Sequence, residues 1–291
     1  MSNQLYIIGN GFDLAHGLPT RYQNYHQYLM DNNELWMCNM LEFFFGNELK
    51  VTENLLWSDL ERALGIYDVE DIYDFLQEGH TLDLDHIGQS TGELEAEVEY
   101  HFVKICEKFN ETFTEWCKSI DLSKTKRIDS LGISGNGTFL TFNYSDTLES
   151  VYGIGDPQVL HIHGRASKDD ELIVGHNKHA SMPTDIKEDF YDHEANYNAI
   201  VDTINRLEKK TGKIISNNRR FFDGLNTIEK IIVIGHSIAD VDMPYFEEVN
   251  KNVNADSKWR FSYHNKEEIG HIDNVAKRLG ISSNNYQLFE L

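Results

Sequence analysis

The amino-acid sequence predicts an α/β fold, with a mainly parallel sheet, helices on both faces and a large helical insertion after the first strand. In the second half of the chain, short and almost wholly apolar runs alternate with helical segments, as buried parallel strands and their crossover helices do. One more apolar run stands near the start of the chain, before a long stretch with helical periodicity. The expected strands are residues 5–8, 137–144, 159–162, 172–174, 230–234, 260–263 and 286–289.

The first strand ends in a glycine turn that we expect to border the functional site. Gly9, Asn10 and Gly11 follow the apolar run directly. Because glycine has no Cβ, such a turn can bring backbone N–H groups close to an anion. The pattern lacks the third glycine of the dinucleotide fingerprint, but its position after the first strand is the one that the fingerprint requires. The sequence therefore predicts that this turn binds the pyrophosphate of a nucleotide.

The chain is expected to fold as a core with one helical insertion. Residues 1–22 and 121–291 carry the expected strands and form the core, whereas residues 23–120 form an insertion or lid packed on it. The clearest helical period of the insertion predicts one long helix, which Ser90 or Thr91 would cap. Its apolar positions are Leu94, Val98, Phe102, Ile105, Phe109, Phe113, Trp116 and Ile120.

Composition and charge exclude several classes of function. The formal net charge of −22 repels phosphate backbones and anionic lipid, so we expect neither long nucleic acid nor a membrane as a partner. The three cysteines form no C-x-x-C pair, which indicates small core residues in a reducing compartment. Neither a basic leader nor an apolar run of about 18 residues is present. We therefore expect a cytoplasmic protein that holds an anionic ligand locally, with backbone amides and a few arginines such as Arg21, Arg165, Arg219 and Arg220.

Polar residues stand at the ends of five expected strands. They are Gly9 to Gly11, Asn143 and Tyr144, His161 to Gly164, Gly175 to Asn177, and Gly235 to Ser237. Ligands of an open parallel sheet bind beyond the carboxyl ends of its strands, where these residues should meet. Buried strand ends have no other need for histidine and asparagine. We therefore expect the five strand ends to line one site.

Several segments resemble known protein families. The opening GNGFDLAHGLPTRY, residues 9–22, is similar to the nucleotide-binding motif of sirtuins, and TFNYSDTLE, residues 141–149, resembles a segment of sirtuin-like domains in bacterial anti-phage proteins. LHIHG and IGHSIADVD, at residues 160–164 and 234–242, resemble two further segments of those domains. With WSDLE at residues 57–61, the whole chain resembles the AbiH family of phage abortive-infection proteins. The resemblance implies a Rossmann-like fold, a nicotinamide-dinucleotide pocket and a role in phage defence.

The resemblance also implies an NAD glycohydrolase that releases nicotinamide and ADP-ribose. Asn143 would hold the ribose or the attacking water, and His163 would contact the ribose hydroxyls or act as the base. The residues expected to bind the dinucleotide are Gly9, Asn10 and Gly11 at the pyrophosphate, Asp13 and Arg21 in the neighbouring loop, and the turn of Gly235, His236 and Ser237, whose serine lies on the adenosine side. The chain lacks the two C-x-x-C pairs of the sirtuin zinc module, so we expect no metal and no deacylase activity.

Two other functions stay open at this stage. In the first, the same turn binds a nucleotide without turnover, and the helical insertion passes the bound state to a partner. In the second, a metal-dependent hydrolase or nuclease gathers imidazole and carboxylate ligands at the sheet edge from His161, His163, His176, His179, His236, Asp240 and Asp242. For the NAD-cleaving function, constant destruction of NAD would be toxic, so we expect an idle state that oligomerisation or a phage-derived trigger releases.

Overall fold

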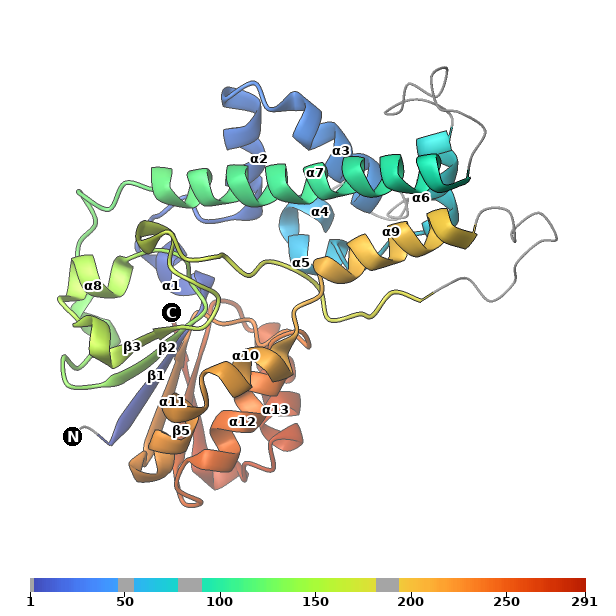
Figure 1. The fold of residues 1–291 in the computed structure, drawn as a ribbon. Helices are drawn as coiled ribbons and strands as arrows, with labels where there is room; N and C mark the ends of the chain where they lie inside the picture. Colours follow the sequence, from blue (N-terminus) through green and yellow to red (C-terminus); the bar gives the residue numbers. More distant parts are fainter. Residues whose placement is uncertain (1–2, 47–54, 78–90, 182–193) are drawn as a thin grey trace. The chain divides into compact units, whose positions relative to one another are not determined.

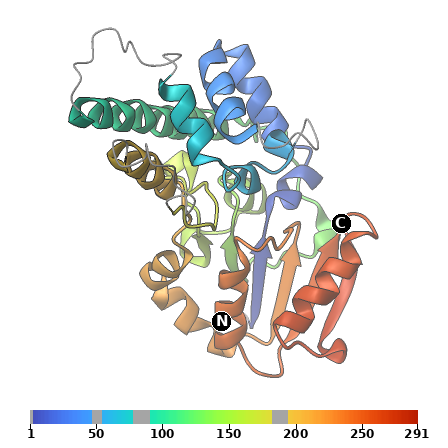
Figure 2. The same cartoon turned by 90° about the vertical axis from the view of Figure 1, so that its right-hand side faces the viewer.

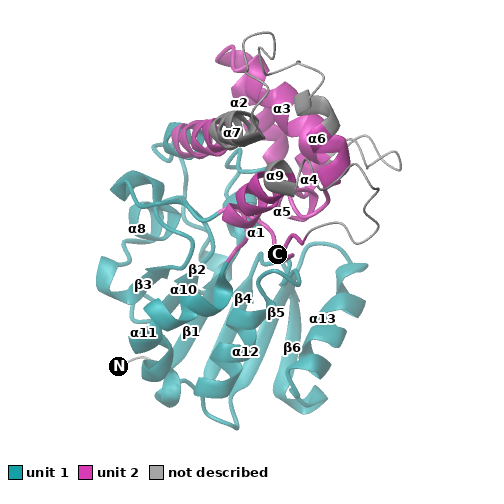
Figure 3. Cartoon of the chain, turned by 45° about the vertical axis from the view of Figure 1, so that its right-hand side comes forward, with its two compact units in different colours: residues 1–21, 116–173, 210–291 teal, residues 22–115, 174–209 magenta. Residues whose placement is uncertain are grey.

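A computed structural model describes the chain except for residues 1–2, 47–54, 78–90 and 182–193 (Figure 1). The described chain divides into two compact units, which Figure 3 shows in different colours. The sheet unit consists of residues 1–21, 116–173 and 210–291, and the helical unit of residues 22–115 and 174–209. None of the described helices combines the length and the apolar composition that a membrane span requires.

The sheet unit contains six described strands, and all of them run parallel (Figures 1 and 2). They are β1 Gln4–Ile8, β2 Thr138–Thr141, β3 Val159–His161, β4 Lys230–Ile234, β5 Lys258–Tyr263 and β6 Tyr286–Glu290. Their order across the sheet is β3-β2-β1-β4-β5-β6. This is the order of dinucleotide-binding sheets, in which the chain switches direction between β1 and β4. The predicted α/β class is confirmed, and the fold is Rossmann-like.

Both faces of the sheet are covered by apolar side chains, which explains why its central strands are almost wholly apolar. Leu5 and Ile7 belong to a buried cluster on one face, and Tyr6 and Ile8 belong to a second cluster on the other. The helices of the first face are α10 Thr211–Asn217, α11 Arg219–Asp223, α12 Met243–Asn252 and α13 Glu268–Arg278. Those of the second face are α1 Asn10–Ala15 and α8 Thr147–Tyr152. Short 3₁₀ helices occupy η3 Asp129–Leu131, η4 Asp156–Gln158, η5 Ala166–Lys168, η7 Gly224–Thr227 and η8 Ser283–Asn285.

The described part of the helical unit is built from helices. They are α2 Tyr22–Asp31, α3 Leu35–Gly46, α4 Leu55–Ser58, α5 Leu60–Ala63, α6 Val69–Gln77, α9 Glu194–Arg206 and most of α7 Thr91–Ser119. The long helix that the sequence predicts is α7. Tyr25 of α2 packs edge-on against Phe113 of α7, and its hydroxyl hydrogen-bonds the Thr112 hydroxyl at 2.8 Å. Aromatic side chains at helical spacing therefore form the interior of this unit.

The strand expected over residues 172–174 is wrong. In this segment the N–H of Ile173 donates to the carbonyl of His163 at 2.9 Å, but no strand ladder forms. Leu172 and Val174 are buried all the same, so burial accounts for the apolar run without a strand. The polar residues that follow belong to the helical unit, where His176 forms an isolated bridge with Glu208. Short apolar runs are ambiguous between strands and buried loops, and this run is a buried loop.

The turn after β1 and the turn after β4 touch backbone to backbone. The N–H of Gly9 donates to the carbonyl of Ile234 at 3.0 Å, and the N–H of Gly11 donates to the carbonyl of Gly235 at 2.7 Å. A Cβ on Gly11 would lie 2.7 Å from the Cα of Gly235, and one on Gly235 would lie 2.6 Å from the Cα of Gly11. The glycines are therefore needed because two main chains pass at a distance that no side chain permits.

Replacing Gly235 by alanine tests this contact. Gly235 combines a φ of +63° with backbone atoms on its Cβ side, so Gly235→Ala should lower the free energy of unfolding by about 3 kcal/mol or more. Gly153 provides the matched control, because its φ is +69° and nothing lies within 4 Å of the place that a Cβ would take. Gly153→Ala should cost only about 1 kcal/mol, the strain of a left-handed residue. Urea unfolding of both variants makes the comparison, and equal losses would contradict the close approach.

Candidate functional site

The site lies at the carboxyl edge of the sheet, where four neighbouring strands end. Gly9 follows β1, Gly235 follows β4, and Asn143 and His163 stand two residues beyond the ends of β2 and β3. These strands are adjacent in the sheet, so four of the five expected strand ends share one edge. The edge includes the point between β1 and β4 where the strand order reverses, which is where open α/β sheets bind their ligands.

Asp13 is a buried carboxyl that links α1 to the loop after β2. Only 1% of its surface is exposed, and its Oδ2 accepts a hydrogen bond from the Ser145 hydroxyl at 2.5 Å. Burial raises the pKa of Asp13, although hydrogen bonds from Ser145, Thr147 and Asn143 act in the opposite direction. The carboxyl of Asp13 therefore joins α1 to the loop after β2, although burying it costs free energy of desolvation.

Asn143 is fixed through its main chain, while its side-chain amide is not saturated. Its N–H donates to the Thr141 hydroxyl at 3.1 Å, and its carbonyl lies 3.1 Å from Nδ1 of His161. The side-chain Nδ2 is buried and makes no hydrogen bond of ordinary geometry with any described residue. It is near enough to the Asp13 carboxyl to lower the pKa of that group. Buried amides are rarely left so, and such a donor suits a ligand or a water molecule.

His163 belongs to a buried cluster with a second histidine and an aspartate. Its Nε2 lies 3.7 Å from Oδ1 of Asp242, and Nε2 of His236 lies 3.6 Å from Oδ2 of the same carboxyl. Phe142 contacts the edge or face of both imidazole rings, with ring centroids 5.1 Å and 4.2 Å apart. The carboxyl thus faces two imidazoles in a buried setting, where charge interactions are strong.

Asp242 also belongs to this cluster. From the sequence it is expected only as a possible metal ligand. It stands directly before α12, where Met243 and Pro244 begin the helix, and aspartate is common at that position as a cap. Its side chain makes no cap hydrogen bond there. Its carboxyl instead faces His163 and His236, a pairing that depends on tertiary packing and has no local signal in the sequence.

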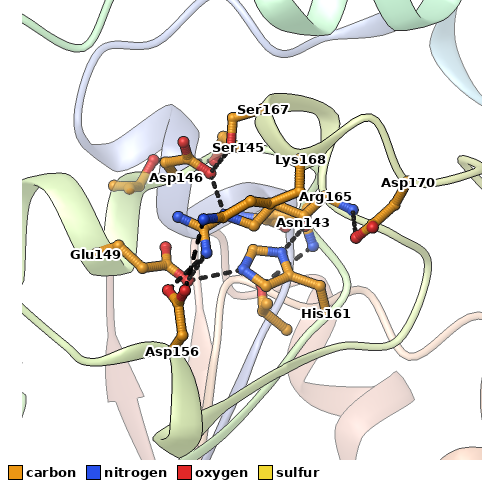
Figure 4. A network of polar contacts seen from close by, with 12 residues as sticks. Asn143, Ser145, Asp146, Glu149, Asp156, His161, Arg165, Ser167, Lys168 and Asp170 are labelled. Carbon is orange, nitrogen blue, oxygen red and sulfur yellow. Dashed lines mark hydrogen bonds and ion pairs between the residues drawn. The ribbon is translucent and has the colours of Figure 1, made fainter.

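His161 does not join His163, although only one residue separates them. The Nε2 of His161 lies 2.8 Å from Oε1 of Glu149 on α8, and its Nδ1 faces the Asn143 carbonyl (Figure 4). The neighbouring Arg165 donates from Nε to Asp146 at 2.6 Å and from Nη1 to Asp156 at 2.8 Å. Arg165 is therefore engaged by carboxylates and is not an anion-binding arginine in this structure.

In the described residues, the histidines that the sequence suggests as metal ligands are not gathered into a metal centre. His176 and His179 belong to the helical unit, where they contact the Ile204 carbonyl and the Glu208 carboxylate. Asp240 pairs with Arg278. Within the described part of the chain, no group of three histidine, cysteine, aspartate or glutamate side chains is placed to hold a metal ion.

The remaining residues of the expected dinucleotide site serve the loops in this structure. Asn10 donates from Nδ2 to the Thr20 carbonyl at 2.8 Å, and the Ser237 carbonyl lies 3.0 Å from Nε2 of His271. Arg21 is exposed. The N–H groups of Gly9 and Gly11 bond to carbonyls of the β4 strand and turn, so these two amides do not point to a ligand. Whether the turn contacts a pyrophosphate through its other groups stays a prediction.

Replacing Asp13 with asparagine tests the cost of burying its carboxyl. Because the pKa of Asp13 is raised, the folded chain binds this proton more tightly than the unfolded chain, and the group's contribution to stability falls as pH rises from about 4. The stability of Asp13→Asn relative to the natural chain should therefore increase as pH rises from about 4, as urea unfolding at each pH measures. The exposed Asp256→Asn serves as control and should show no such trend. A relative stability of Asp13→Asn that stays constant or falls with pH would contradict the raised pKa.

Comparison with known proteins identifies the family of this chain. A family model described as Bacteriophage abortive infection AbiH matches residues 5–263, from the second residue of β1 to the last residue of β5. Searches of the curated proteins and of the solved structures found no match. The match covers the edge with Asn143, His163 and Asp242 as well as the helical unit. The chain belongs to the AbiH family of bacteriophage abortive infection proteins.

Proposed function

We propose that this chain, whose family suggests a role in abortive infection defence against bacteriophage, hydrolyses NAD to nicotinamide and ADP-ribose. The observation that supports the proposal is the buried amide of Asn143, which lacks an ordinary hydrogen bond among the described residues and stands on the sheet edge that also carries His163. An amide donor and an imidazole at the strand ends of a Rossmann-like sheet suit a ribose and a water molecule.

The chemistry asks little of the protein besides orientation and a base. The bond between C1′ of the ribose and the pyridinium nitrogen breaks, and nicotinamide leaves as a neutral molecule without an acid. The oxygen of a water molecule adds to C1′, which becomes cationic in an oxocarbenium-like transition state. One proton of that water passes to a base. Asn143 would hold the water or a ribose hydroxyl, and His163 would accept the proton.

Asp242 suits the task of supporting His163. Its carboxyl lies 3.7 Å from Nε2 of His163 and would stabilise the imidazolium that forms when the ring takes a proton. A buried acidic group at this edge also favours a sugar carbon that becomes positively charged. The burial of Asp242 and His163 keeps these interactions from being screened by water.

The sheet edge offers fewer suitable groups for the phosphates of NAD than for its ribose. The Gly9 and Gly11 amides already donate to backbone carbonyls. The residues left to bind the pyrophosphate are therefore Asn10, Arg21 and the turn with Gly235, His236 and Ser237. Since α1 has only six residues, its dipole adds little to binding of the phosphates. The assignment of NAD thus depends more on the ribose side of the site than on the phosphate side.

Nicotinamide release from NAD by purified variants tests the catalytic residues. Asn143→Ala and His163→Ala should each lower turnover by about 10²-fold or more while leaving the fold intact, because each removes a group that acts on the water or the ribose. Asp242→Asn should lower turnover less, since the base itself remains. His264→Ala, at an exposed position after β5, is the control and should retain the parent rate.

The outcomes separate the proposal from its alternatives. If Asn143→Ala and His163→Ala cleave NAD at the parent rate, the residue assignment is wrong. Thermal stabilisation by NAD without any product would favour a nucleotide sensor, and activity that a chelator abolishes would favour a metal-dependent enzyme. If infection supplies the trigger, the test is made in phage-infected bacteria that express either the natural chain or Asn143→Ala. The NAD content of these cells is measured. Only cells with the natural chain should lose NAD after infection.

A further inference from the structure

Both ring nitrogens of His161 face oxygen atoms that accept hydrogen bonds. Nδ1 lies 3.1 Å from the carbonyl of Asn143, and Nε2 lies 2.8 Å from Oε1 of Glu149 (Figure 4). The His161 and Glu149 side chains are 7% and 10% exposed, so water does not readily replace either contact. A buried side chain thus spans the short distance between α8 and the main chain of a site residue.

The hydrogen count at these contacts requires an additional proton. A neutral imidazole carries one N–H and can donate to only one of the two oxygens, while the lone pair of its other nitrogen would face an oxygen lone pair. Both contacts are satisfied only when His161 and Glu149 together hold one proton more than a neutral imidazole and a carboxylate. Loss of that proton removes the donor from one contact, so either the Asn143 carbonyl or the Glu149 carboxylate loses its partner.

The charged groups around this pair come from four segments. Glu149 belongs to α8, and Arg165 follows β3 with its Nη1 3.6 Å from Oε1 of Glu149. The two nearer partners of Arg165 are Asp146, in the loop after β2, and Asp156, in η4, at 2.6 Å and 2.8 Å. These two carboxylates lie closer to the guanidinium than Glu149 does, and the imidazole of His161, at 2.8 Å, is nearer to Glu149 than Arg165 is.

The register of the sheet explains why His161 can act on Asn143. His161 ends β3 opposite Thr141, the last residue of β2, and Asn143 follows Thr141 by two residues. The Thr141 hydroxyl accepts from the N–H of Asn143 while His161 contacts its carbonyl, so both polar atoms of the Asn143 main chain are held. The buried Nδ2 of the Asn143 side chain is left without an ordinary hydrogen bond among the described residues.

We propose that His161 is a positioning residue that holds Asn143 in its active geometry, and that the proton shared between His161 and Glu149 determines whether it does. This inference rests on the proposed function for the role of Asn143, but the contact itself exists without any substrate. When His161 and Glu149 hold this proton, His161 fixes the Asn143 carbonyl and thereby the direction in which the Asn143 side-chain amide points. Deprotonated, the pair keeps one N–H, which favours the charged carboxylate of Glu149, so the Asn143 carbonyl loses its donor. The site therefore has a pH-dependent support that is separate from the proposed base, His163.

Nitrogen NMR of the full-length, ¹⁵N-labelled chain without NAD tests the contact. The ring nitrogens of His161 are assigned by their loss in His161→Gln, and the side-chain amide of Asn143 by its loss in Asn143→Ala. In a titration from about pH 5 to about pH 9, the Asn143 amide signals should move with the same midpoint as the His161 ring. Glu149→Gln should shift that common midpoint to lower pH, because the carboxylate no longer favours the proton. His264→Gln should leave it unchanged.

Two results would overturn the proposal. One is an Asn143 amide whose signals do not follow the His161 titration, and the other is an Asn143 amide that titrates unchanged in His161→Gln. Where His161→Gln fails to fold, as thermal unfolding would show, Glu149→Gln decides by the presence or absence of the midpoint shift.

Kinetics add a second readout that depends on the proposed function. His161→Gln should lower kcat for NAD cleavage by about tenfold or more and change KM by less than about twofold, because it misplaces a group without removing it. A kcat within about twofold of the parent value would contradict the positioning role. If the natural chain releases no nicotinamide, the proposed function fails, while the NMR titration still decides whether His161 positions Asn143.

Discussion

The backbone contact between the turns after β1 and β4 is the constraint on which the sheet edge depends. Gly11 and Gly235 pass so closely that their main chains share a hydrogen bond of 2.7 Å, and Gly9 bonds to the end of β4 in the same way. Because β1 is central, this contact sets where α1 begins and therefore where Asp13 enters the interior. The first role of these glycines is therefore to let the two turns pack against each other. A ligand at this edge would bind groups that this packing does not already engage.

Burial of polar groups is the second feature of the edge, and each buried group constrains the next. Asp13 is desolvated, which raises its pKa, and it stays in place because Ser145 donates to it. Ser145 lies in the loop that also carries Asn143, so this hydrogen bond joins α1 to the segment that follows β2. A buried polar network favours a single arrangement when all its hydrogen bonds are made. The side-chain amide of Asn143 lacks an ordinary hydrogen bond in this network, and it is the group that the proposed function assigns to a ligand.

The sequence predicts the sheet well because its signal is local. Apolar runs followed by glycine, asparagine or histidine indicate strand ends, and six of the seven expected strands are present. It fails at residues 172–174, where an apolar run is buried without a ladder. The partners of the histidines could not be predicted, because Glu149 and Asp242 come from helix starts whose distance to His161 and His163 depends on tertiary packing. The use of the Gly9 and Gly11 amides also depends on a contact between turns more than 200 residues apart in sequence.

His161 at the end of β3 and His163 two residues later have different surroundings, although only one residue separates them. His161 is held by a carbonyl and a carboxylate at hydrogen-bond distance, which makes it a fixed support. The Nε2 of His163 has the Asp242 carboxylate at 3.7 Å, and aromatic rings surround the imidazole. Proton exchange suits the proposed base, whereas the proposed support keeps both of its contacts only while it holds the additional proton with Glu149. The two proposed roles therefore rest on the difference in partner distance and not on the residue type.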